Sequence, residues 1–193
     1  MSAAELADEL DLARAGNPDA WGQLYRQYAP AIFRFCRRAL PSREDAEDAT
    51  TEIFMKVRNK IGQYDTTRPF TAWLYKVAAN HCWDTLRRRR VRQDLETGDL
   101  ETLPLEHPDP NQLEQLLVQR TGQQVRGALG QLPDRARLAL VLRYYAEMSY
   151  DEIAEALGVR RPFVGVLLLR ARHQLREALE QRGVSNPDLR GKP

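Results

Sequence analysis

Cysteines, histidines and glycine-rich loops are scarce in this sequence, and each scarcity argues against a class of protein. The only two cysteines, Cys36 and Cys82, are far apart and form no CxxC pair, so we expect reduced thiols and neither a disulfide framework nor a zinc site. The three histidines are scattered without a second ligand at metal-binding spacing, and no phosphate-cradling glycine loop occurs. We therefore expect no metal, no cofactor and no catalytic site.

Long apolar runs are also missing. No stretch of 18 apolar residues exists, so the sequence predicts no transmembrane helix and no membrane insertion. Residues 1–16 are acidic and do not resemble a signal peptide. We therefore expect a cytoplasmic protein.

Charge, by contrast, is abundant and uneven. Residues 20–92 hold fifteen basic against seven acidic side chains, and residues 120–182 hold eleven arginines against seven acids. Between them, residues 93–119 hold seven acids and no base. Two basic blocks around an acidic segment indicate a polyanion partner for the blocks and a solvated, extended connector between them.

The apolar spacing of the first basic block is helical, and no strand pattern occurs anywhere. We predict a helix from about Asp19 to Leu40, which Pro30 kinks or restarts, and a second helix that Ser42 caps and Gly62 ends. A loop at 63–69 follows. Residues 70–91 then form one helix or two abutting helices.

The second basic block is predicted to contain a helix-turn-helix. An amphipathic helix runs from about Leu113 to Gly130, and Pro133 opens the next. SYDE at 149–152 is a capping box, and Gly158 ends that short helix in the left-handed conformation. Pro162 then starts a long helix to about Gln181.

The predicted fold class is all-α, with two small helical domains joined by an acidic flexible linker. The domains span residues 10–92 and 112–182. The linker, residues 93–111, contains three prolines and a glycine. The tail, residues 183–193, is predicted to be disordered.

Residues 128–159 resemble region 4 of bacterial RNA polymerase sigma factors. The matching residues are Leu132, Pro133, Arg137, Arg143, Ser149, Tyr150, Glu152, Ile153, Ala154, Leu157 and Gly158. The resemblance implies that the second helix enters the major groove of the -35 element while arginines hold phosphates. The candidate DNA contacts are Arg160, Arg161, Phe163, Val166, Leu167, Arg170 and Arg172.

The final helix departs from this family, which usually carries polar residues on its groove-facing side. Here Val164, Leu168, Ala171 and Leu175 lie where the core face belongs, and a second apolar set faces the DNA side. That set is Phe163, Gly165, Val166, Leu167 and Leu169. Apolar side chains cannot donate hydrogen bonds to base edges. We therefore hypothesise weak or unusual -35 binding, or a protein contact on this face.

Residues 20–57 resemble regions 2.1 and 2.2 of the small extracytoplasmic-function (ECF) sigma factors, and residues 63–90 resemble their regions 2.3 and 2.4. The second match is carried by Arg68, Pro69, Phe70, Ala72, Trp73, Leu74, Tyr75, Asn80, Asp84 and Arg87 to Arg90. The two resemblances cover about residues 10–182. They imply a non-enzymatic initiation subunit that binds core RNA polymerase and promoter DNA, commonly held by an anti-sigma factor.

Opening a promoter requires the capture of unstacked bases, for which aromatic faces and polar groups are suited. The resemblance implies that residues 63–71 and Asn80 form the pocket for a non-template base of the -10 element. The candidates are Tyr64, Asp65, Arg68, Phe70, Thr71, Trp73, Tyr75 and Asn80, with Arg87, Arg88, Arg89, Arg90 and Arg92 on phosphates. Core packing of the four aromatic residues, and a merely solvated arginine row, remain the alternatives.

The acidic helix from Glu44 to Lys60 resembles the family's polymerase contact. The resemblance implies binding to the β′ clamp helices, and region 4 implies a contact with the β flap. The candidates are Asp45, Asp48, Glu52, Phe54 and Met55. Thr50 and Thr51 depart from the family pattern. The negative charge of the linker would suit a segment that lies in a nucleic-acid channel and mimics RNA. The alternative is that the linker is only a flexible tether.

Two other functions stay open. A stand-alone helix-turn-helix regulator would explain residues 120–182 but not the aromatic and basic segment at 63–92. A sigma-like protein with weakened region 4 DNA binding would use a protein partner instead.

Overall fold

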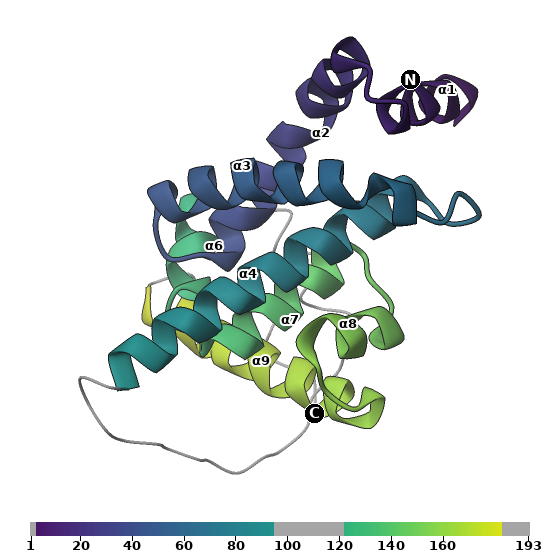
Figure 1. Cartoon of the computed structure of the whole chain (residues 1–193). Helices are drawn as coiled ribbons and strands as arrows, with labels where there is room; N and C mark the ends of the chain where they lie inside the picture. Colours follow the sequence, from purple (N-terminus) through teal and green to yellow (C-terminus); the bar gives the residue numbers. More distant parts are fainter. Residues whose placement is uncertain (1–2, 95–121, 183–193) are drawn as a thin grey trace. The chain divides into compact units, whose positions relative to one another are not determined.

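The computed structural model of the chain describes residues 3–94 and 122–182, and within these ranges every regular element is a helix (Figure 1). This confirms the all-helical fold class. None of the helices in the described part of the chain combines the length and apolar character needed to span a membrane.

The chain divides into two compact units, Met1–Cys82 and Trp83–Pro193. The division falls inside α4 (Phe70–Asp94), which is one continuous helix and contains residues 93 and 94, assigned from the sequence to the linker. The linker from residue 95 onward, the predicted helix start at Leu113 and the tail at 183–193 lie outside the described residues.

The first unit begins with a helix that the sequence analysis did not predict. α1 (Ala3–Arg14) turns through Gly16, whose φ of 86° favours glycine, into α2 (Pro18–Ala39). The side chain of Asn17 caps α2 by accepting from the amides of Asp19 and Ala20, at 2.8 and 3.2 Å. α2 runs through Pro30 without ending, so the predicted restart there is wrong.

The end of α3 (Arg43–Lys60) also differs from the prediction. Ser42 caps its start by accepting from the Asp45 amide at 2.9 Å. At its other end the chain tightens directly into the 3-10 turn η1 (Ile61–Gln63), and Gly62 lies inside this turn without a positive φ. Gly62 is therefore no left-handed C-cap, because the Tyr64 amide already closes the turn on the Ile61 carbonyl at 3.2 Å.

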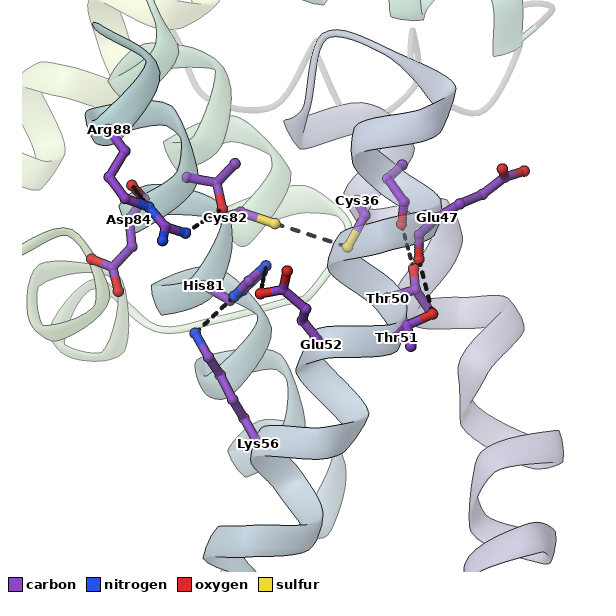
Figure 2. A network of polar contacts seen from close by, with 12 residues as sticks. Cys36, Glu47, Thr50, Thr51, Glu52, Lys56, His81, Cys82, Asp84 and Arg88 are labelled. Carbon is purple, nitrogen blue, oxygen red and sulfur yellow. Dashed lines mark hydrogen bonds and ion pairs between the residues drawn. The ribbon is translucent and has the colours of Figure 1, made fainter. Parts of the chain in front are cut away.

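The core of the first unit joins α2, α3 and the start of α4. Phe35 and Ile53 are fully buried, and the Phe35 ring lies 5.5 Å from that of Tyr75. Cys36 and Cys82 are fully buried free thiols whose sulfur atoms are 3.9 Å apart (Figure 2). Two cysteines distant in sequence thus become neighbours through helix packing.

The second unit contains, besides the end of α4, the helices α6 (Gly122–Leu129), α7 (Asp134–Tyr144), α8 (Tyr150–Leu157) and α9 (Arg161–Gln181). α9 packs against α6, α7 and α8. The helix-turn-helix prediction is confirmed in detail. Ser149 and Glu152 form both halves of the capping box, and Gly158 adopts φ 61° and ψ 40° between α8 and α9.

Replacing Ser149 by alanine is expected to destabilise the second unit by about 1 kcal/mol, because the Glu152 amide loses its acceptor. Urea unfolding followed by circular dichroism measures the loss. Threonine at this position keeps the hydroxyl and should retain most of the stability. Equal unfolding free energies for S149A and S149T would contradict the cap.

Candidate nucleic-acid interface

The side chain of Tyr64 bridges the loop between η1 and α4. The Tyr64 hydroxyl donates to the carbonyl of Arg68 at 2.5 Å, and its ring lies 5.5 Å from Phe70 and 5.3 Å from Trp73. Burial raises the pKa of this phenol, which keeps the hydroxyl protonated and able to donate. One side chain therefore spans the segment from Asp65 to Pro69.

Two predicted base-stacking residues turn out to be core residues. Tyr64 is 7% exposed and Phe70 is 3% exposed, and Phe70 also contacts the ring of Tyr28 edge-on at 5.2 Å. Neither ring offers a free face to a base, because clustering the rings removes their apolar area from water. For Phe70 the core-packing alternative is the one that the structure supports.

The polar residues of the loop stay accessible. Asp65, Arg68 and Thr71 are exposed. The Asp65 carboxylate accepts from the hydroxyl and the amide of Thr67, at 2.7 and 2.9 Å, and these bonds lower the pKa of Asp65. The loop thus exposes the ionised carboxylate of Asp65 and the guanidinium of Arg68, and the hydrogen bonds from Thr67 hold its conformation.

One side of α4 carries the next group of predicted residues. Positions 73, 80, 84 and 87 recur at intervals of seven, four and three, which places them along one face of a helix. Trp73 is half-buried, with part of its ring against Tyr64, whereas Asn80 and Arg87 are exposed. We call residues 73, 80, 84 and 87 the α4 ridge.

Tyr75 does not belong to this ridge. It lies two residues after Trp73, on the other side of α4, and is half-buried against Phe35. The structure therefore does not bring Tyr75 together with the other predicted base-contacting residues.

The arginine row follows at the end of α4, where Arg87 lies on the ridge and the next three arginines point to other sides of the helix. Arg87, Arg88, Arg89 and Arg90 are all exposed, and Arg88 also bonds to the Asp84 carbonyl and the Thr85 hydroxyl, at 3.3 and 3.4 Å (Figure 2). The side chain of Arg92 lies outside the described residues. Successive arginines on a helix can reach several phosphates of one backbone.

The candidate polymerase-contacting residues of α3 form a stripe along one helix face, with the exception of Phe54. Asp45, Asp48, Glu52 and Met55 recur at helical spacing along one face, and Met55 is 63% exposed. Phe54, by contrast, is 6% exposed, with its ring 4.8 Å from that of Tyr25. Phe54 is thus a core residue, and Met55 is the apolar member of the acidic stripe.

A network that the sequence analysis missed joins this stripe to α4 (Figure 2). Lys56 donates to Nδ1 of the buried His81 at 2.8 Å, and Nε2 of His81 lies 3.8 Å from the Glu52 carboxylate. Because an ammonium group can only donate, Nδ1 accepts and Nε2 carries the proton toward Glu52. His81 follows the exposed Asn80 directly, so these contacts hold α4 at the residue next to the ridge. No local sequence signal pairs residues that are 25 positions apart.

Thr50 and Thr51, which depart from the family pattern, turn their hydroxyls back onto α3. They donate to the carbonyls of Ala46 and Glu47 at 2.6 and 3.2 Å (Figure 2). Both also line a surface pocket between α2 and α3. The two hydroxyls are therefore satisfied within their own helix.

The DNA-facing side of α9 is less apolar than predicted. Leu167 is 8% exposed and lies on the core side, three residues after Val164 and four before Ala171, and Leu169 is also buried. Leu167 thus offers little surface to DNA. Phe163 remains 42% exposed, and Gly165 and Val166 are half-buried, so the apolar set shrinks to these three residues.

The predicted phosphate contacts of the second unit divide into two groups. Arg160, Arg161 and Arg170 are exposed, and Arg161 pairs with Asp151 at 2.9 Å. Arg172 is half-buried and donates to the Tyr144 hydroxyl of α7 at 3.3 Å, so it is engaged within the unit. Phe163, Val166 and Arg170 recur at helical spacing and lie along one side of α9, where Phe163 and Arg170 are exposed and Val166 is half-buried.

Two family models match the chain. The model for sigma-70 region 2 matches residues 24–92, and the model for sigma-70 region 4 matches residues 122–175. Each match contains one of the two groups of candidate DNA contacts.

Similar proteins extend this likeness over most of the chain. The ECF RNA polymerase sigma factor SigE of Mycolicibacterium smegmatis is 35% identical over 161 residues, which are 83% of this chain and 62% of SigE. The RNA polymerase sigma factor CnrH of Cupriavidus metallidurans is 31% identical over 183 residues, which are 91% of this chain and 96% of CnrH.

The fold is similar as well. The solved structure of CnrH in complex with the cytosolic domain of CnrY aligns with a TM-score of 0.59 at 25% identity, over 90% of this chain and 96% of that one. Two matched regions in the order 2 then 4, together with a relative matched over nearly its full length, show that the chain belongs to the ECF sigma factors of bacterial RNA polymerase.

Proposed function

We propose that this sigma factor uses the acidic stripe of α3 to bind core RNA polymerase, and the loop at 64–69 with the α4 ridge to open the -10 element. The α4 ridge is the observation that carries the proposal. It aligns an accessible part of Trp73, the exposed amide of Asn80 and the exposed Arg87 along one helix face. A stacking surface, a hydrogen-bonding group and a phosphate contact are the groups needed to capture an unstacked base.

The -35 contact is assigned to α9. The exposed Arg160, Arg161 and Arg170 would hold phosphates, while Phe163 and Val166 would face the groove. Weak -35 binding with a protein contact through Phe163 and Val166 remains the alternative. A stand-alone regulator would leave the region 2 match at residues 24–92 without a role.

The domain plan that accompanies this function is a region 2 domain at residues 10–92, a linker at 93–111 and a region 4 domain at 112–182. Such a subunit acts by binding, without a chemical step of its own, in the cytoplasm where the polymerase works. CnrH has been solved with the cytosolic domain of CnrY, and RpoE of Bartonella quintana with the anti-sigma factor NepR. We propose by analogy that an anti-sigma factor holds this chain.

Transcription in vitro tests the proposed function. Core polymerase without any sigma factor is mixed with the full chain and with promoters found by mapping transcript starts after overexpression. We expect RNA synthesis that needs both core and chain, and co-purification of the two. Binding to duplex DNA without any association with core would instead support the stand-alone regulator.

A further inference from the structure

The helix α1 reaches the proposed -10 loop through its last side chain. Arg14 donates from Nη2 to the Tyr64 carbonyl at 2.7 Å and from Nε to the Ile61 carbonyl at 3.3 Å. The two carbonyls mark the end of α3 and the start of the loop. The Arg14 side chain is 27% exposed and both bonds are partly buried, so water competes less for them than at an open surface.

Arg14 also contacts the residue that closes the loop. Its guanidinium carbon lies 5.6 Å from the centre of the Tyr64 ring. Tyr64 in turn donates to the Arg68 carbonyl and packs against Trp73 of the α4 ridge. A single arginine thus holds the backbone and the ring of the residue on which the loop geometry depends.

The position of Arg14 is itself held by packing. Leu10 and Ala13 of α1 are buried, and the Trp21 indole of α2 donates to the Ala13 carbonyl at 3.2 Å. Asp11 adds an ion pair to Arg14 Nη1 at 3.3 Å. The planar guanidinium is therefore presented to the loop from a fixed support and in one orientation.

We propose that Arg14 is a positioning residue for recognition of the -10 element: it holds the loop in its base-binding shape before DNA arrives. This inference rests on the proposed function of the loop and the α4 ridge. Residues 65–69 are all exposed, so their own burial contributes little to their order. Arg14 fixes the start of this loop, and Tyr64, which Arg14 holds, bonds to the Arg68 carbonyl near its other end. Ordering such a loop in advance reduces the entropy lost when a base binds.

The test compares R14A with R14K and with a charge-matched control, Arg58→Ala, which removes an exposed arginine from α3. Each full chain is bound to core polymerase. The probe is a single-stranded oligonucleotide with the non-template -10 sequence of a mapped promoter, with either the native base or a wrong base at the captured position. The readout is the ratio of the two affinities.

R14A is expected to lower this ratio roughly tenfold, as the loss of one to two hydrogen bonds would. R58A should match the wild type. R14K keeps the charge but cannot donate to both carbonyls in a fork, so an intermediate ratio is expected, and this variant also serves if R14A folds poorly. Affinity for core and the melting temperature are measured in parallel, because a purely structural role would change these and leave the ratio intact.

The outcomes separate the two proposals. If the wild type discriminates between the bases and both Arg14 variants discriminate equally well, the positioning role is wrong while the proposed function stands. Equal weakening of the native and the wrong oligonucleotide by R14A would also overturn the role. If the wild type on core shows no base preference at all, the proposed function of the loop fails, and the inference about Arg14 fails with it.

Discussion

Replacing Arg87, Arg88, Arg89 and Arg90 together by alanine is expected to flatten the salt dependence of promoter binding and to remove most of its strength. All four side chains are exposed, so their guanidinium groups can reach phosphates without rearrangement of the core. Each phosphate contact releases condensed counterions and contributes about 0.9 to the slope of log affinity against log salt. Without the four guanidinium groups, that slope should fall by roughly 3 to 4, and the affinity at low salt should fall on the order of 100-fold or more.

The measurement is the affinity of the complex of core and chain for a labelled promoter at several salt concentrations. A variant with four lysines in place of the arginines is the matched control, because it keeps the charge and should keep most of the slope. Circular dichroism checks that α4 remains folded. If the alanine variant retains the wild-type slope, the arginine row is only a solvated helix face.

Phe35→Ala is expected to destabilise the first unit by about 3–5 kcal/mol. The Phe35 side chain has no exposed area and contacts the Tyr75 ring of α4, so its truncation leaves a cavity where α2 meets α4. Small domains have only about 5–15 kcal/mol of stability in total. A large part of the first unit should then unfold at growth temperature, and core-dependent transcription should fall with it.

Urea unfolding followed by tryptophan fluorescence measures this effect, since two of the three tryptophans, Trp21 and Trp73, lie in the first unit. Leu12→Ala serves as the control. Leu12 is 48% exposed on α1, so its truncation should change the unfolding free energy by about 0.5 kcal/mol or less. A cost below about 1 kcal/mol for Phe35→Ala would show that the core closes around the gap.

Local chemistry explains which predictions the structure confirms. The capping box of Ser149 and Glu152 and the left-handed Gly158 depend on residues within ten positions of one another, so their sequence pattern is sufficient. The exposed arginine row follows equally from composition, because four consecutive charges cannot all be buried.

The structure departs from the sequence analysis mainly in which way some side chains face. Tyr64, Phe54 and Leu167 were candidates for contacts with DNA or polymerase, and each is buried. Their neighbours in space, such as Trp73 for Tyr64 and Tyr25 for Phe54, come from other helices. Gly62 failed as a C-cap for a related reason, since α3 continues into a 3-10 turn whose first carbonyl, that of Ile61, accepts from the Tyr64 amide and from Arg14.

The amino-acid sequence alone determined the helical class, the helix-turn-helix, the charge of each block and the resemblance to sigma regions 2 and 4, because periodicity, caps and motifs are properties of neighbouring residues. Only the tertiary structure decided which aromatic residues are accessible, that His81 links Lys56 and Glu52, and that Arg14 of α1 holds the loop at Tyr64. Contacts between residues 25 to 50 positions apart depend on how helices pack, and no local pattern records that packing.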